Sequence, residues 1–271
     1  MGDFELGMQK DYSSIDRFWY SFVTFFQKTL LFARLEVHSI KWKNVKPPPG
    51  CAYNPTEIEH IANVLTHGIW IIPAVLGALE LVWRAKSSTQ ELVAWVYGGA
   101  LILLFFVSTI FHGVFYINRH RKLKNVLHRC DRAMIYVFIA GSYFPWLHLA
   151  HLAHPVVLRS LQWCVWCLAA MGIIYQQMYH ERYKCLETFL YIVMGLGPSL
   201  VVIMFGNDFQ GMFELKLGGF LYILGICFFK ADGIIPCAHA IWHLFVVMAA
   251  GVHYFAILKH LFPPYTNIPT D

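Results

Sequence analysis

Hydrophobic positions along this chain gather into long runs, whereas a soluble protein shows short alternating segments. Apolar runs near the length of a membrane span recur between residues 61 and 260. They predict seven membrane-spanning helices, at about 61–83, 92–117, 132–150, 161–179, 187–205, 217–230 and 236–260. Pro73, Pro145 and Pro198 fall inside three of these runs, where we expect kinks. The pattern indicates an all-α membrane protein, a seven-transmembrane helix bundle.

Composition supports this class and excludes soluble ones. Of the 271 residues, 58% are hydrophobic and only 14% are charged, and the mean hydropathy is +0.51. The net charge of +5 is modest and sits in particular loops, so it suits anionic lipid and not nucleic acid. Cys164 and Cys167 lie one turn apart in an apolar run, and we interpret them as small packing residues, not as a metal pair.

Three regions follow from this pattern. Residues 1–52 form a cytoplasmic head in which 15–40 mixes aromatic with basic side chains, as an amphipathic helix in the lipid headgroup layer would. Packing of that segment against the bundle is the alternative. Three prolines and a glycine, at 47–50, end the head as a stiff spacer. Residues 53–262 form the membrane domain, and 263–271 are a short proline-rich tail.

The distribution of basic residues predicts the orientation. Of the 21 Lys and Arg residues, fifteen fall in the head, the 118–130 and 180–186 loops and at Lys230. Five fall on the opposite side, and Arg132 lies at a boundary. Under the positive-inside rule this asymmetry predicts a cytoplasmic N-terminus and a luminal or extracellular C-terminus.

Five polar residues stand inside or beside apolar spans, where ionisable groups are costly and point to function. Ser108 with His112, and His239 with His243, each have i, i+4 spacing, which places both side chains on one helix face. Asp131 opens the third span. The predicted topology brings all five to the cytoplasmic ends of their helices. Glu59, Asn63 and His67 in the first span fall on the same side.

Each of these residues also has an ordinary explanation. Ser108 could bond its own helix carbonyl, and Asp131 could pair with Arg132 at the surface. The shared depth of three helices nevertheless favours a metal site. Three imidazoles with one carboxylate suit an open zinc site held by His112, His239 and His243. We interpret Glu59, Asn63 and His67 as supporting residues that do not contact the metal.

The motifs resemble those of the progestin and adipoQ receptor (PAQR) family, which is related to hemolysin III and to alkaline ceramidases. They are Asn63-x-x-Thr66-His67 with Glu59 upstream, Ser108-x-x-x-His112, Asp131, and His239-x-x-x-His243 behind Pro236. Other segments, such as 143–146 and 229–236, look closest to the monocyte-to-macrophage differentiation factor branch. The resemblance implies seven helices with an inward N-terminus and zinc on the three histidines. It also implies that Asp131 and Ser108 lie beside the water that zinc activates, and it suggests Golgi or late endosomal and lysosomal membranes.

Two functions compete at this stage. One is a zinc-dependent hydrolase of a lipid amide, in which Asp131 accepts a proton and Ser108 donates to the oxyanion. Its partners would be membrane lipids, such as a ceramide-like N-acyl lipid or a free fatty acid. The other is a receptor or scaffold with structural zinc and cytoplasmic signalling partners. A bis-histidine haem protein is disfavoured, because haem-binding helices usually pair histidines across a bundle.

Overall fold

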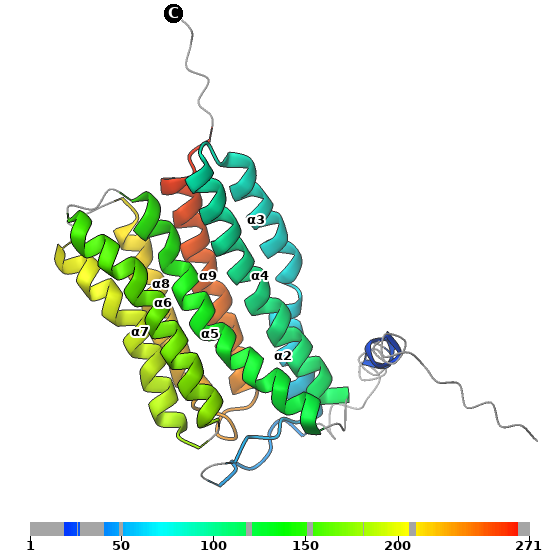
Figure 1. The fold of residues 1–271 in the computed structure, drawn as a ribbon. Helices are drawn as coiled ribbons and strands as arrows, with labels where there is room; N and C mark the ends of the chain where they lie inside the picture. The colour runs from blue at the N-terminus through cyan, green and yellow to red at the C-terminus, as the bar shows by residue number, and fades with distance from the viewer. Residues whose placement is uncertain are drawn as a thin grey trace, which may run out of the picture.

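The computed structural model describes residues 19–25, 27, 41–48, 51–117, 121–150, 154–180, 182–205 and 210–264. The regular structure within these residues is α-helical, arranged as a bundle of roughly parallel and antiparallel helices (Figure 1). The helices are α2 (Glu57–Gly68), α3 (Ile71–Arg84), α4 (Ser88–Ile117), α5 (Arg121–Leu149), α6 (Pro155–Met178), α7 (Lys184–Phe205), α8 (Met212–Phe229) and α9 (Ala238–Leu261).

Five segments of this bundle are long and apolar enough to cross a bilayer: α2 together with α3, then α4, α7, α8 and α9. The helices α5 and α6 lie beside them and have comparable length, but α5 in particular carries more polar residues. An all-helical membrane bundle is therefore observed in the described residues. The count of seven spans and their orientation stay predictions.

The first span is divided by its proline. The helix α2 ends at Gly68 and α3 begins at Ile71, so Ile69 and Trp70 lie between them. A proline ring clashes with the carbonyl four residues earlier, which for Pro73 is that of Ile69. The expected kink is therefore a short break at Ile69 and Trp70, four and three residues before the ring. Pro145 and Pro198 lie inside α5 and α7, as predicted.

The third helix is longer than the apolar run that predicted it. We expected a start near residue 132, yet α5 begins at Arg121. Its first two turns contain good helix formers such as Lys122 and Leu123, both exposed, so the helix continues past the apolar stretch. Asp131 therefore lies ten residues inside a helix and not at its start. This position fixes the direction of its side chain through the helix.

Only part of the head is described. Residues 19–25 are helical, and Phe25 is buried against Tyr116 of α4 with ring centroids 5.7 Å apart. Trp19, Tyr20 and Val23 on the same segment are exposed. The remainder of the predicted amphipathic stretch 15–40, and the tail from residue 265, lie outside the described residues.

Small residues let the central helices approach closely. A side chain at Gly98 of α4 would come within 2.5 Å of the Ala78 Cβ on α3, and α9 buries Ala249, Ala250 and Ala256. Such residues allow close packing where lipid supplies no hydrophobic driving force. Cys164 and Cys167 are exposed, so our interpretation of them as buried packing residues is wrong. Their helix, α6, presents that face outward.

Candidate metal site

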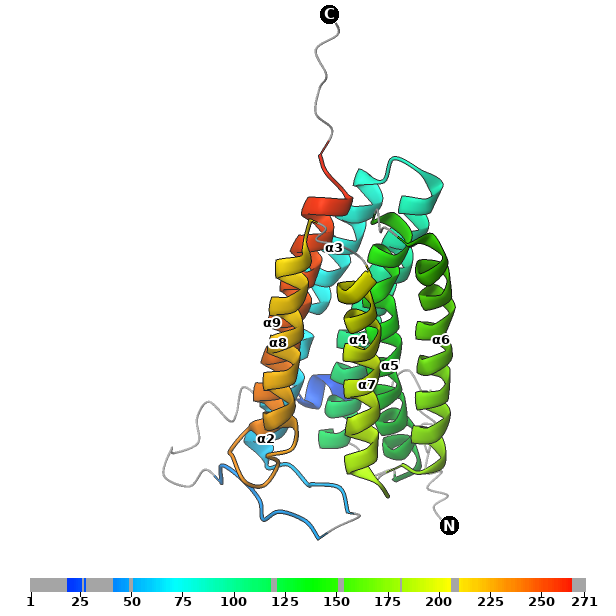
Figure 2. The same ribbon diagram turned by 90° about the vertical axis from the view of Figure 1, so that its left-hand side faces the viewer.

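Three histidines from two helices converge at one end of the bundle. We call it the histidine end: α2, α5 and α9 begin there and α4 ends there (Figures 1 and 2). His112 comes from the last turns of α4, and His239 and His243 come from the first turns of α9. One ring nitrogen of each lies within 4.8 Å of the others. His112 and His243 are buried and His239 is partly buried, so the group could bind a metal ion.

Residues outside α9 contact the His239 and His243 rings at their Nδ1 atoms. The Nδ1 atom of His243 lies 3.0 Å from the Thr66 hydroxyl, which donates its own hydrogen to the Ala62 carbonyl at 2.8 Å. The His243 ring therefore donates from Nδ1 and keeps a lone pair on Nε2. On His239, Nδ1 lies 3.7 Å from the Asp232 carboxylate. A hydroxyl partner such as Thr66 fixes the tautomer of a metal-binding histidine, here His243.

Sequence reasoning assigned no role to Thr66 or Asp232. Thr66 belongs to the motif that carried the family resemblance, one residue before His67, and Asp232 lies in the loop that precedes α9. The sequence signal for Thr66 and Asp232 is weak: each is a hydroxyl or carboxylate residue that lies close in sequence to a candidate histidine.

The donor set fits a cation. Within the described residues, neither nitrogen of His112 has a hydrogen-bond partner, although the side chain is only 3% exposed. The Ser108 hydroxyl and the Asn63 amide oxygen are likewise buried without a partner in the described chain. Each unsatisfied buried polar group costs about 1–3 kcal/mol. A metal on His112 would satisfy one such atom, and neutral imidazole nitrogen is a ligand that zinc prefers.

His67 and Asn63 lie behind the group. The His67 ring stacks on His243, with centroids 3.8 Å apart and an angle of 17° between the rings. Its nitrogens are not among those that lie within 4.8 Å of one another. The backbone oxygen of Asn63 lies close to the His243 ring. These positions agree with supporting roles, in which the two residues pack against His243.

Glu59 ties two helices together. Its carboxylate accepts hydrogen bonds from the Tyr53 hydroxyl (2.8 Å), the Thr56 backbone (2.8 Å) and the Cys237 backbone (3.3 Å). Burial raises the pKa of the Tyr53 phenol, and Glu59 adds to this, so Tyr53 remains a donor. Cys237 is held at φ 53°, a left-handed conformation that costs a residue with a Cβ. Glu59 thereby fixes the start of α9 two residues before His239.

Asp131 lies beside the three histidines and outside the group they form. Its carboxylate lies near the Ser108 hydroxyl and His239, and it lines the same cavity. Arg132, the partner considered for Asp131, donates a hydrogen bond to Glu187 at 2.6 Å. Asp131 is therefore placed near the candidate metal position with Ser108 as its neighbour.

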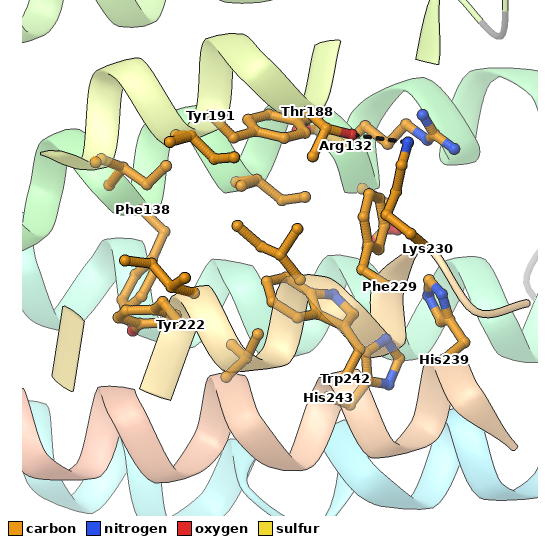
Figure 3. A pocket seen from close by; sticks show the side chains of 18 of the residues that line it. Arg132, Phe138, Thr188, Tyr191, Tyr222, Phe229, Lys230, His239, Trp242 and His243 are labelled. Atoms are coloured by element: carbon orange, nitrogen blue, oxygen red, sulfur yellow. Dashed lines mark hydrogen bonds between the residues drawn. The ribbon is translucent and has the colours of Figure 1, made fainter. Parts of the chain in front are cut away.

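The histidines stand at one end of a cavity of about 1060 Å³. Its walls are mostly apolar and come largely from α4, α5, α7, α8 and α9, including Phe138, Tyr222 and Trp242 (Figure 3). Both His243 and His253 line it. Ten residues of helix rise about 15 Å, so the cavity is deep enough for a large part of a lipid chain.

Comparisons with known proteins agree with this arrangement. The sequence profile described as "Haemolysin-III related" matches residues 56–254, from α2 into α9. The human "Monocyte to macrophage differentiation factor" is 46% identical over 232 residues, which cover 85% of this chain and 94% of that protein. The "Hemolysin-3 homolog" of Bacillus subtilis is 34% identical over 205 residues, covering 74% of this chain and 93% of the relative. The "Adiponectin receptor protein" of Drosophila melanogaster is 26% identical over 222 residues, covering 72% and 49%. The resemblance predicted from the motifs is confirmed.

Proposed function

The chain belongs to the haemolysin-III-related family of multi-pass membrane proteins, and on this premise we propose that it is a zinc-dependent hydrolase of lipid amides. The observation that carries the proposal is the buried trio His112, His239 and His243 at the end of an apolar cavity. Three histidines leave a fourth position open, and an open position distinguishes catalytic from structural zinc sites.

His112, His239 and His243 would hold the ion, with Thr66 and Asp232 orienting two of the rings. The chemistry that a bound zinc ion would supply is a water molecule whose pKa falls from about 15.7 to about 7, and so a hydroxide nucleophile at neutral pH.

The residues around the trio supply the remaining chemistry. Asp131 would accept a proton from the nucleophile and deliver it to the leaving amine, a role supported by its closeness to His239 and Ser108. The Ser108 hydroxyl has no hydrogen-bond partner in the described chain, so it is available to donate to the developing oxyanion. The apolar walls bind the acyl chain and exclude bulk water. A ceramide-like N-acyl lipid has the amide and the chain that this arrangement needs.

A non-catalytic receptor or scaffold is the second candidate. It is favoured by the printed name of the Drosophila relative, an adiponectin receptor protein. In that case the cavity would bind a lipid such as a free fatty acid, and a zinc ion would stabilise the histidine end. Either function suits a Golgi or late endosomal and lysosomal membrane with signalling partners at the cytoplasmic N-terminus.

Asp131 distinguishes the two candidates. Purified full-length protein, Asp131→Ala and the isosteric Asp131→Asn would be assayed for zinc content and for hydrolysis of long-chain N-acyl lipids. The hydrolase predicts one zinc in all three proteins and turnover only in the unmodified chain. Zinc lost together with Asp131 would favour a closed structural site. Turnover that persists in both variants would remove Asp131 from the mechanism, and a zinc-loaded chain without turnover would favour the receptor.

A further inference from the structure

The cavity carries a ring of cationic side chains at the histidine end. Six basic residues line it there: Lys46, Lys124, Arg132, Arg182, Lys184 and Lys230. The carboxylates that line the same end already have partners. Glu59 accepts backbone and phenol hydrogen bonds, and Asp131 and Asp232 face His239.

Three of the cations lack an acidic partner among the described residues. The Lys230 ammonium bonds only neutral oxygens, the Thr188 hydroxyl at 3.1 Å and the Lys184 carbonyl at 3.2 Å, and Figure 3 shows its side chain between Thr188 and His239. Lys46 is exposed and makes no hydrogen bond or ion pair within the described chain. The Lys124 ammonium stands 3.4 Å from the Phe115 ring centroid. Positive charge is therefore left over at the mouth of an otherwise apolar chamber.

Residues 41–48 and 51–56 hold some of these cationic side chains in place. They lie under the helix ends beside the loop that joins α8 to α9 (Figure 2). Lys43 donates to the Ile234 carbonyl at 2.8 Å, and Lys184 donates to the Cys51 carbonyl at 2.8 Å. Gly233 has φ 74°, and a Cβ there would lie 2.7 Å from the Lys46 Cα. The backbone of Lys46 is thus packed onto the loop, so its ammonium is kept near the opening.

We propose that the cavity takes a lipid whose headgroup carries a phosphate, with the chain in the apolar chamber and the phosphate among Lys46, Lys124 and Lys230. A phosphate offers several charged oxygens to separate ammonium donors, whereas a neutral headgroup would leave these cations unmatched. The binding of a phosphorylated lipid does not depend on the proposed hydrolase activity. Only the statement that such a lipid is the substrate rests on the proposed function. For the hydrolase it means that the N-acyl substrate is phosphorylated.

Binding can be measured without turnover, because Trp146 and Trp242 line the cavity. A bound ligand that carries a quencher would lower their fluorescence. Two probes would be compared on the full-length protein in neutral detergent: a long-chain ceramide with a spin label on its acyl chain, and the same molecule phosphorylated on its primary hydroxyl. We expect the phosphorylated probe to quench tryptophan fluorescence at concentrations at least tenfold lower than the neutral probe. Equal affinity for the two probes would overturn the proposal.

Two lysines at the same end provide a matched comparison. Lys230→Gln is expected to lower the affinity for the phosphorylated probe about fivefold and to leave the affinity for the neutral probe unchanged. Lys122→Gln removes the same charge from an exposed position of α5 outside the cavity lining, and it should change neither probe. If both substitutions lowered the affinity for the phosphorylated probe equally, the probe would be attracted by the general surface charge, and the proposed phosphate site would be overturned.

Inorganic phosphate separates a lipid headgroup from a free anion. If inorganic phosphate displaces the phosphorylated probe with an affinity equal to that of the probe itself, the lipid assignment is overturned. Much weaker displacement by phosphate supports it. Selective binding without hydrolysis of any lipid would refute the hydrolase and leave this inference standing. Hydrolysis of the neutral ceramide without headgroup selectivity would refute this inference and leave the hydrolase standing.

Discussion

At the scale of single residues, the candidate metal site is defined by which ring nitrogens remain available. His112 has two buried nitrogens without a partner in the described chain, and the Thr66 hydroxyl contacts the Nδ1 atom of His243. One ring nitrogen of each of the three histidines faces the others. Such an arrangement is poorly stable unless a cation lies between them, because buried lone pairs need donors or ions.

We predict that His112→Ala lowers zinc affinity by more than about 100-fold, because it removes a ligand and not merely a supporting group. The measurement is zinc content of the purified protein by elemental analysis, together with thermal unfolding. His260→Ala, a histidine paired with Glu214 at the opposite end of α9, is the control and should keep one zinc per chain. Full zinc occupancy in the His112 variant would refute the site.

Thr66→Val should weaken zinc binding by about 10–100-fold while the stoichiometry at saturation stays one. The substitution keeps the volume and removes the oxygen that receives the His243 Nδ1 hydrogen. Competition with a chromogenic chelator measures the affinity. Thr66→Ser should restore it, and an unchanged affinity in Thr66→Val would mean that the hydroxyl does not orient the ring.

At the scale of helices, the site depends on the contact between α2 and α9. The Glu59 carboxylate caps the start of α2 and also receives the backbone N–H of Cys237, which precedes α9. The α9 helix begins from a left-handed residue, so its first turn is held by this contact and not by a capping side chain of its own. A shift of α9 would displace both of its histidines together.

Glu59→Gln is therefore expected to lower the free energy of unfolding by about 1–3 kcal/mol, since an amide cannot accept all of the hydrogen bonds of a buried carboxylate. Glu57→Gln is the matched control, because Glu57 is exposed in the same first turn. Thermal unfolding of both variants in detergent provides the comparison. Equal stability of the two variants would show that Glu59 does not join the helices.

At the scale of the whole molecule, the cavity and the metal site share one end of the bundle. Basic residues also concentrate at this end, in the 41–48 segment, the start of α5 and the loop after α6. Charge asymmetry of this kind orients membrane proteins during insertion. The candidate site would then open toward the cytoplasm.

We predict that an N-terminal epitope tag is accessible to antibody after selective permeabilisation of the plasma membrane, and that a C-terminal tag is not. The fifteen-to-five division of Lys and Arg is the physical reason. Full permeabilisation should expose both tags and serves as the control. A protected N-terminal tag would reverse the orientation and move the site to the lumen.

The residues of the candidate site could be predicted from sequence because their relations are local or follow from alternating helix direction. The i, i+4 spacing of His239 and His243 sets their common face by helix geometry alone. Alternating spans then bring His112 to the same depth. Pro73 likewise indicated where the first span is interrupted. The start of α5 was missed, because the end of an apolar run does not mark the end of a helix.

Tertiary structure alone decided how these residues are supported and what they face. The bond between Thr66 and His243 joins residues 177 apart, and that between Glu59 and Cys237 joins residues 178 apart. No periodicity relates such positions, because they depend on how two helices cross. The cavity has the same origin, since it is the space that α4, α5, α7, α8 and α9 leave unfilled between them. Sequence by itself determined a membrane bundle with three histidines at one end, because helical period and hydrophobicity act locally. The packing of distant helices decided the Thr66 contact of His243, the hydrogen bond of Glu59 at the start of α9 and the basic residues at one end of the cavity.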